Sequence, residues 1–399
     1  MIQTFAEAIP MIKKLFAGIA AVLVIVVALF LSYGARFVDA RMNVVLHKPP
    51  YAVSPAAKAL HARLRVADMH DDLLLWPRDP LVKSTVGSTD LPRLVEGNVA
   101  IEIFSTVSKT PRGQNYAGNS GETDNITLLA LAERRPIANW TSLLERAKWT
   151  SAKAHDAAER SRGRLVLVTT AAELERQLTA RETRHDLVIG VLSLEGLQVL
   201  EGKLRNLDTL YSLDFRMAGL AHFFDNEVAG SAHGLTKGGL SPLGRDVVRK
   251  MEGLGMIVDL AHVAPKAVDD VLAMATRPVV VSHGGVAAVC PGPRNWTDEQ
   301  LRRLANNGGV IGIGYWAAAI CDVSPRGVVK AIRHAVEVAG VDHVGLGSDW
   351  DGAISAAFDA TGMGLVTEAL LAEGFNANEI AKIMGENVIR ILGQGLPQR

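Results

Sequence analysis

The sequence predicts an α/β fold: a (β/α)8 barrel of the TIM type, preceded by an N-terminal transmembrane helix. Eight short apolar runs rich in β-branched residues recur along the chain, and amphipathic segments separate them. Continuous apolar strands joined by helices are typical of parallel strands that are buried on both faces. Eight strand and helix units within about 330 residues fit a closed barrel. A further apolar run near the N-terminus lies outside this pattern.

The N-terminal apolar run covers residues 15–31, and Lys13 and Lys14 come directly before it. At about 1.5 Å per residue, a helix of this length spans roughly 25 Å, which is enough to cross a bilayer. The lysine pair favours a cytoplasmic N-terminus and an exported main domain, periplasmic or extracellular. A signal peptide cut before Arg41 is the alternative, but the apolar run is longer than the usual signal-peptide core of about 7 to 15 residues. We therefore expect residues 1–40 to form an uncleaved membrane anchor.

Residues 41–62 contain three prolines and are interpreted as a linker with a short helix, which leads into a barrel domain of residues 63–399. The eight predicted strands cover residues 65–72, 98–105, 186–196, 217–226, 255–263, 277–285, 308–316 and 342–352.

Two of the predicted helices have clear start signals. Ser241 and Pro242 supply an N-cap and a first-turn proline, and Thr297 forms a capping box with Gln300. A doubly wound open sheet is the competing architecture, but it normally has a glycine-rich turn after its first strand, which is absent here. The glycines within 308–314 occur in a late strand, so we interpret them as packing glycines rather than a dinucleotide loop.

The composition excludes several classes of protein. The 399 residues include 42 Lys and Arg against 42 Asp and Glu, with the two signs interspersed, which argues against a nucleic-acid partner. A hydrophobic content of 48% is typical of a folded globular chain. The two cysteines, Cys290 and Cys321, exclude a cysteine-based zinc site and allow at most one disulfide.

Histidines and carboxylates lie at the carboxyl ends of the predicted strands. They are His70, Asp72, Glu195, His222, His262, His283 and Asp349. In a barrel these ends meet on one face, where the active sites of this architecture lie. His70 and Asp72 are two residues apart, so their side chains point to the same side of the strand. His233, in a glycine-rich loop, is a further candidate.

Burial of such a cluster would be costly without a cation. Imidazole and carboxylate ligands without a thiolate suit zinc, with manganese, iron or cobalt as substitutes. Because the cluster exceeds the needs of one ion, we expect two ions about 3.5 to 4 Å apart, bridged by a carboxylate and by the water that attacks the substrate. Glu195, alone at the end of its strand, is the best candidate for the bridge.

Seven segments surround these polar residues in order between about residues 65 and 392. They are ADMHDDLLLW, SLEG, GLAHFFDN, GLSPLGRDVVRKMEGLGMIVDLAHV, VVVSHGG, PGPRNW and GLGSDWDG. Together they resemble the membrane dipeptidase (renal dipeptidase) family of zinc peptidases. The D-x-H-x-D opening of that family is matched by Asp68, His70 and Asp72.

The resemblance implies two Zn²⁺ ions per chain: His70, Asp72 and Glu195 would hold one, and Glu195, His262 and His283 the other. It implies that His222 and Arg294 contact the substrate or the tetrahedral intermediate, and that Asp349 transfers a proton. The implied substrate is a short peptide, with the stereochemistry of its C-terminal residue left open. A disulfide between Cys290 and Cys321 and a homodimer are also implied.

The sequence departs from the family in two ways. A second cysteine pair of the mammalian members is absent, with Phe224 at one expected place. The animal enzymes have a C-terminal lipid-anchor signal, whereas the anchor predicted here is N-terminal. Two polar loops, residues 106–125 and 225–239, follow strands on the catalytic face and are expected to shape the substrate pocket.

Two other functions stay open at this point. Amidohydrolase barrels that act on lactones or N-acyl amino acids use similar metal sites, but they usually open with His-x-His and often bridge their metals with a modified lysine. A non-catalytic, membrane-tethered binding protein is the second alternative. Against it, every expected metal ligand is present.

Overall fold

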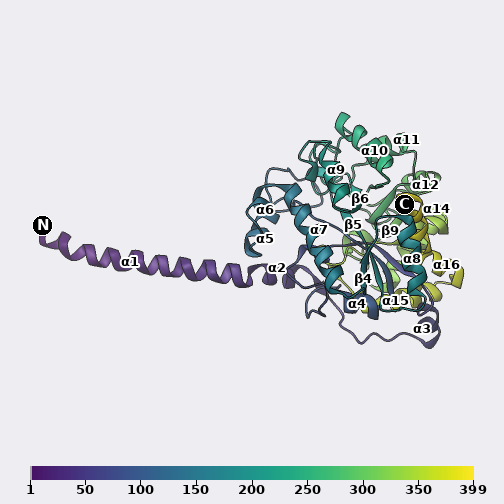
Figure 1. Cartoon of the computed structure of the whole chain (residues 1–399), viewed down its shortest axis with the longest axis horizontal. Coiled ribbons are helices and arrows are strands. Elements are labelled where there is room, and N and C mark those ends of the chain that lie inside the picture. Colours follow the sequence, from purple (N-terminus) through teal and green to yellow (C-terminus); the bar gives the residue numbers. More distant parts are fainter. Residues whose placement is uncertain (1) are drawn as a thin grey trace.

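The computed structural model describes residues 2–399, and eight of its parallel strands close into a barrel with helices around it (Figure 1). The order β3-β2-β10-β9-β8-β7-β6-β5 is closed by pairing of β3 with β5. The strands are β2 (Val66–Asp71), β3 (Val99–Phe104), β5 (Val188–Leu194), β6 (Phe215–Gly219), β7 (Ile257–Asp259), β8 (Val280–Gly284), β9 (Val310–Ile313) and β10 (Val344–Leu346). Each overlaps one of the eight predicted runs. The closed barrel confirms the predicted fold class and excludes the open sheet.

One short strand, β4 (Leu165–Leu167), is absent from the prediction. It pairs with Val188–Gly190 at the start of β5, whereas β6 pairs with Leu192–Leu194 at the end of the same strand. Because β3 occupies the other edge of β5, β4 fills the space on the edge that β6 leaves free. The addition extends the sheet without opening the barrel.

Helices follow most strands and cover the outside of the barrel (Figure 1). They are α3 (Pro55–His61), α4 (Leu91–Glu96), α5 (Ile126–Ala132), α6 (Ala138–Thr141), α7 (Leu143–Arg160), α8 (Ala171–Arg181), α9 (Asn206–Ser212), α10 (Pro242–Leu254), α11 (Pro265–Met274), α12 (Asp298–Asn306), α13 (Ala317–Ile320), α14 (Pro325–Ala339), α15 (Met363–Ala372), α16 (Ala377–Ala381) and α17 (Asn387–Gly395). Both predicted start signals are confirmed: Ser241 caps α10 through the amide of Gly244, and Thr297 forms a capping box with Gln300 at α12.

Gly309 and Gly312 allow β9 to pack closely against the neighbouring strand, whereas Gly308 has a φ of 84° and lies in the turn before β9. A Cβ atom on Gly312 would lie 2.2 Å from the carbonyl oxygen of Ser282 on β8, which is far inside van der Waals contact. A side chain here would displace the backbone of β8, so the interpretation as a packing glycine is confirmed for Gly312. The contact matters for the site because Ser282 precedes His283.

The N-terminal segment forms a long helix that extends away from the barrel (Figure 1). It consists of α1 (Ile2–Leu29), a π-helical turn η1 (Phe30–Gly34) and α2 (Ala35–Met42). Within it, residues 13–42 are long and apolar enough to cross a membrane, with a mean hydropathy of 2.9 over the most apolar window, none of which is buried. This is the helix that the sequence predicts.

The segment after the long helix is attached to the barrel domain. Asp39 on α2 is 2% exposed, and its carboxylate pairs with Arg78 at 2.8 Å. Strand β1 (Val44–Val45) then pairs in parallel with β11 (Ser355–Ala356). The predicted linker of residues 41–62 therefore pairs with the barrel domain near its start, at Val44 and Val45.

Candidate metal centre

The seven polar side chains predicted at the strand ends lie together at one end of the barrel. They come from β2, β8 and the segments that follow β2, β5, β6, β7 and β10. All seven are buried, with exposures from 1% for His70 to 7% for Asp349. Residues more than 270 positions apart in the chain, such as His70 and Asp349, are therefore neighbours, as the parallel barrel requires.

The predicted strands extend further than the observed ones, most of all at β6, β7 and β10. β6 ends at Gly219, β7 at Asp259 and β10 at Leu346, so His222, His262 and Asp349 lie in loops rather than on strands. His262 and Asp349 have φ angles of 62° and 61°, in the left-handed region that non-glycine residues rarely adopt. The chain leaves the strand direction at these points, which turns both side chains into the cluster.

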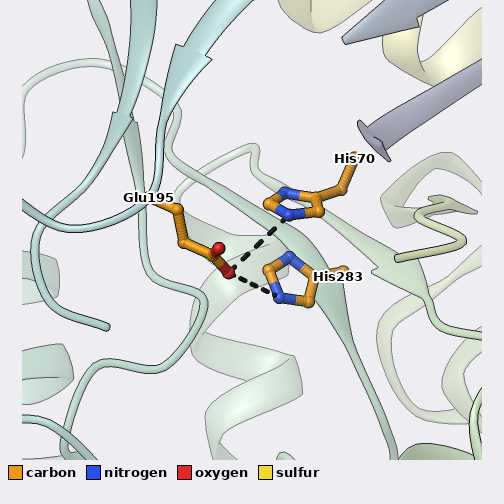
Figure 2. A group of neighbouring side chains, drawn as sticks. All are labelled: His70, Glu195 and His283. Carbon is orange, nitrogen blue, oxygen red and sulfur yellow. Dashed lines mark ion pairs between the residues drawn. The ribbon is translucent and has the colours of Figure 1, made fainter. Parts of the chain in front are cut away.

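Glu195 is at the centre of the cluster. Its Oε1 lies 2.9 Å from Nε2 of His262, 3.4 Å from Nε2 of His283 and 3.6 Å from Nε2 of His70. Figure 2 shows the carboxylate of Glu195 directed toward the rings of His70 and His283. Its second oxygen, Oε2, lies 3.4 Å from Nε2 of His222.

Three groups of three residues bring potential metal-ligand atoms within 4.8 Å of one another: His70, Glu195 and His283; Glu195, His222 and His262; and His70, Asp72 and Asp349. Every ligand that the resemblance implies belongs to one of them. The grouping differs from the implied one, since His222 joins His262 and Asp349 joins Asp72. Glu195 and His70 belong to two groups each, so neither is confined to a single ion site.

The pKa shifts in the cluster arise from burial and from carboxylates that lie close together. Burial lowers the pKa of His70, but Glu195, Asp72 and Asp349 together raise it to about 10. Burial and Asp72 raise the pKa of Glu195 well above its usual range. Nε2 of His70 and Oδ1 of Asp72 are buried without a hydrogen-bond partner. The residues therefore fit divalent cations, which would satisfy these atoms and offset the negative charge of the carboxylates.

Two residues that sequence reasoning missed orient His283. Oγ of Ser282 donates to Asp259 at 2.6 Å and therefore accepts from Nδ1 of His283 at 2.9 Å. With the proton on Nδ1, the lone pair of Nε2 faces Glu195, which is the tautomer that a metal ligand needs. Asp259 lies in the segment VDLAH and Ser282 in the segment VVVSH. Only the pairing of β7 with β8 shows that the two residues meet.

His222 is held as a neutral imidazole, since burial lowers its pKa to about 3. Its Nδ1 lies 3.4 Å from the carbonyl oxygen of Lys109. Its Nε2 points to Glu195 and the cavity.

Arg294 provides a buried positive charge beside the cluster. One of its Nη atoms donates to the carbonyl oxygen of His283 at 2.7 Å, while its Nε has no hydrogen-bond partner. The guanidinium lies 4.9 Å from the ring centre of Trp316, and burial lowers its pKa. Arg294 is thus positioned to bind an anion in the cavity.

Asp349 has an environment suited to proton transfer. Burial raises the pKa of its carboxyl to about 7, with Asp72 acting in the same direction and His70 and Arg294 opposing it. A carboxyl with such a pKa can both accept and release a proton near neutral pH.

A cavity of about 730 Å³ opens onto the cluster. Asp72, Glu195, His222, His262, Arg294 and Asp349 are among the residues that line it. The predicted loop of residues 106–125 contributes Val107, Thr110, Gln114, Asn115, Tyr116 and Asn125. The loop of residues 225–239 was also expected here, but it supplies none of the lining residues. His233 of this loop stacks on Phe223, with ring centres 4.5 Å apart, and Phe223 is the residue of the pair that lines the cavity.

Cys290 and Cys321 are joined by a disulfide, with Cα atoms 5.4 Å apart. The bridge connects the segment that carries Arg294 to the residue after α13, the short helix that begins after Trp316.

The closed barrel and the buried imidazole and carboxylate cluster at its carboxyl end define a metal-dependent barrel enzyme. The chain belongs to the membrane dipeptidase family, peptidase family M19, whose family model matches residues 55–396. It is a metal-dependent dipeptidase, a hydrolase of peptide bonds. The family resemblance seen in the sequence is thereby confirmed.

Individual relatives agree with this assignment. Dipeptidase tcpJ of Claviceps purpurea is 32% identical over 320 residues, which cover 78% of this chain and 70% of the relative. The crystal structure of dipeptidase AC, a metallopeptidase of family M19, superposes with a TM-score of 0.67 at 26% identity and covers 84% of this chain and 99% of that one. A metallopeptidase of Rhodobacter sphaeroides, bound to a phosphinate mimic of L-Ala-D-Ala, gives 0.66 at 25% identity, with 83% and 99% covered.

Proposed function

We propose that this chain is a membrane-anchored dipeptidase that uses two Zn²⁺ ions and accepts dipeptides with a D-residue at the C-terminal side. The observation that carries the proposal is the position of Glu195, which has one carboxylate oxygen within 3.6 Å of three imidazole nitrogens and belongs to two of the potential metal groups. A carboxylate in this position is suited to bridge two ions.

The ligands of the first ion would be His70, Asp72 and Glu195, and those of the second Glu195, His262 and His283. Imidazole and carboxylate donors without a thiolate are typical of hydrolytic zinc sites. When bound, two such ions supply Lewis acidity for the peptide carbonyl and lower the pKa of a water molecule. The protein residues around them bind the substrate and move protons.

Arg294 binds the free carboxylate of the dipeptide, because a guanidinium forms two parallel hydrogen bonds with such a group. Binding the C-terminus this close to the cluster restricts the substrate to short peptides. The structure of the Rhodobacter relative with a mimic of L-Ala-D-Ala supports a dipeptide of this class.

His222 contacts the reacting carbonyl group of the substrate. Its ring is neutral, so it carries one proton. The distance of 3.4 Å between Nδ1 and the carbonyl oxygen of Lys109 is too long to fix that proton on Nδ1. When the ring carries its proton on Nε2, it can donate to the oxygen on which negative charge develops. Asp349 accepts a proton as the peptide bond is attacked and delivers it to the departing amine, for which its raised pKa is suited.

The N-terminal helix is the membrane anchor in this proposal, with the barrel domain exported and the enzyme a homodimer. The segment before Arg41 supplies buried contacts to the domain, through Asp39 at 2% and Ala35 at 7% exposure. A cut before Arg41 would remove both. These contacts favour an uncleaved anchor over a signal peptide.

Replacement of the proton-transfer carboxylate tests the mechanism. In Asp349→Asn, kcat for L-Ala-D-Ala should fall by about 10² to 10⁴, since a positioned acid–base group typically contributes this much. KM should change little, and bound zinc should stay at the wild-type level. A separate panel of L,L-, L,D- and N-acylated substrates, assayed with and without added zinc, measures the substrate preference of the wild-type enzyme. Full activity of the variant would contradict the role of Asp349.

A further inference from the structure

We infer that the active-site cavity opens at the membrane surface and takes dipeptides that carry an apolar tail, with the N-terminal helix forming the wall against which the tail lies. The inference rests on the proposed dipeptidase function and on the proposed membrane anchor. It adds a substrate class and a set of specificity-determining residues that lie outside the metal centre.

The cavity that contains the metal cluster extends to the N-terminal helix. Phe30, Phe37, Val38 and Met42 line the same cavity as Glu195 and Asp349. Their spacing places them on one face of the helix, which is the face turned to the barrel domain. Residues that belong to the anchor by sequence are therefore part of the substrate site by position.

This wall is fixed to the domain. Ala35 belongs to an apolar cluster with Leu75, Trp76, Val107, Ile126, Leu129 and Ala132. The carboxylate of Asp39 accepts a hydrogen bond from Nδ2 of Asn43 at 2.8 Å and pairs with Arg78. The carbonyl of the Asn43 side chain in turn accepts from the amide of Ala353 at 2.9 Å. The helix thus keeps one position relative to the metal centre.

The outer wall is apolar and lies at the level where the membrane is expected to end. Phe30 falls within the apolar run of residues 15–31 that is proposed to span the bilayer. Phe30 and Phe37 are 40% and 65% exposed, although both line the cavity. With the exposed Val38 and Met42 they form a contiguous apolar surface, which is typical of a contact with lipid or with an apolar ligand.

The size of the cavity agrees with a substrate larger than a simple dipeptide. At about 730 Å³ it lies in the upper part of the range of roughly 300 to 1,000 Å³ that holds drug-sized ligands. The lining combines the polar cluster around Glu195 and Arg294 with the apolar side chains of the N-terminal helix. A ligand that matches both kinds of lining is an amphiphile, with its peptide bond at the metals and an alkyl chain toward the helix.

A series of dipeptides with free termini tests the inference. The N-terminal residue is L-alanine, L-norleucine or L-2-aminodecanoic acid, followed by D-alanine, and the full-length protein is held in lipid nanodiscs. We expect kcat/KM to rise with each added methylene by up to about fourfold, the value for complete burial of a CH₂ group. A flat or falling series in the wild-type protein would overturn the inference.

A matched pair of variants locates the effect. Phe37 lines the cavity and Tyr33 does not, although both belong to the same helix and are 65% and 64% exposed. Phe37→Ser combined with Phe30→Ser should remove at least half of the gain for the 2-aminodecanoyl substrate, measured as the ratio of its kcat/KM to that of L-Ala-D-Ala in the same variant. Tyr33→Ser should keep the whole series unchanged. Equal effects of the two changes would show that the preference arises from partition into lipid and not from this wall.

A binding measurement distinguishes failure of this inference from failure of the proposed function. If L-Ala-D-Ala is not hydrolysed at all, the proposed function fails. Calorimetric titration of 2-aminodecanoyl-D-alanine into the same nanodiscs still measures how much the helix side chains contribute to the affinity for the tail. Affinity that is lost in the Phe30 and Phe37 variant supports the wall, and affinity equal to that of L-Ala-D-Ala contradicts it.

Discussion

The side chains of the metal centre are expensive to bury alone and favourable to bury together with cations. Glu195 is 5% exposed and lies beside Asp72 and Asp349, so repulsion and desolvation raise its pKa. His70 is held as an imidazolium by the same neighbours, with a pKa of about 10. Cations offset this electrostatic cost by taking the place of the bound protons.

The raised pKa values predict that metal binding is coupled to proton release. His70, whose pKa is about 10, holds a proton at pH 7 in the metal-free protein, and the ion must displace that proton. Zinc affinity should therefore rise with pH and should continue to rise above pH 7, where ordinary histidines and carboxylates no longer titrate. Competition with a chelator between pH 6 and 8 measures the affinity. Calorimetry in two buffers of different ionisation enthalpy measures the protons, and heats that do not depend on the buffer would contradict the prediction.

The sequence could predict the principal site residues because a parallel barrel places every strand end on one face. His70, Glu195, His262, His283 and Asp349 are recognisable by that position alone. The roles of Asp259 and Ser282 could not be predicted in this way, because they arise from hydrogen bonds between neighbouring strands. Nor does local sequence indicate the left-handed backbone at His262 and Asp349, which is fixed by the surrounding loops.

At the scale of elements, the strands were predictable and their ends were not. Buried parallel strands are apolar along their whole length, so the eight runs stand out from the amphipathic helices between them. β4 does not stand out, since it has only three residues and two of them are partly exposed. The predicted ends of β6, β7 and β10 lie too far along the chain. No turn signal in the sequence separates these strands from the site residues that follow them.

The packing of β9 against β8 supports the metal ligand His283. We expect Gly312→Ala to destabilise the protein by about 1 to 3 kcal/mol, because its methyl group would displace the backbone at Ser282. Gly253→Ala on α10 is the matched control: nothing lies within 4 Å of its Cβ position, and the change should stabilise the helix by roughly 0.5 to 1 kcal/mol. Chemical denaturation of both variants measures the difference. Equal midpoints would show that the close contact at Gly312 has no structural role.

At the scale of the whole molecule, the N-terminal helix and the barrel form one functional unit. The sequence predicts the anchor from its apolar composition, and it predicts the barrel from its strands. It does not predict that the two meet at the active-site cavity. The contact depends on Asp39 and Arg78, whose pairing no local pattern indicates. With this helix as the proposed membrane anchor, the active site would lie at a fixed distance from the bilayer.

The central claim is that residues from opposite ends of the domain sequence meet to bind a pair of catalytic metal ions. The most direct test is the zinc content of the purified full-length protein, measured by elemental analysis together with hydrolysis of L-Ala-D-Ala. We expect two zinc ions per chain, loss of activity when a chelator removes them and recovery when zinc is returned. A protein with less than one bound metal ion per chain, or one that hydrolyses the dipeptide equally well without metal, would contradict the account.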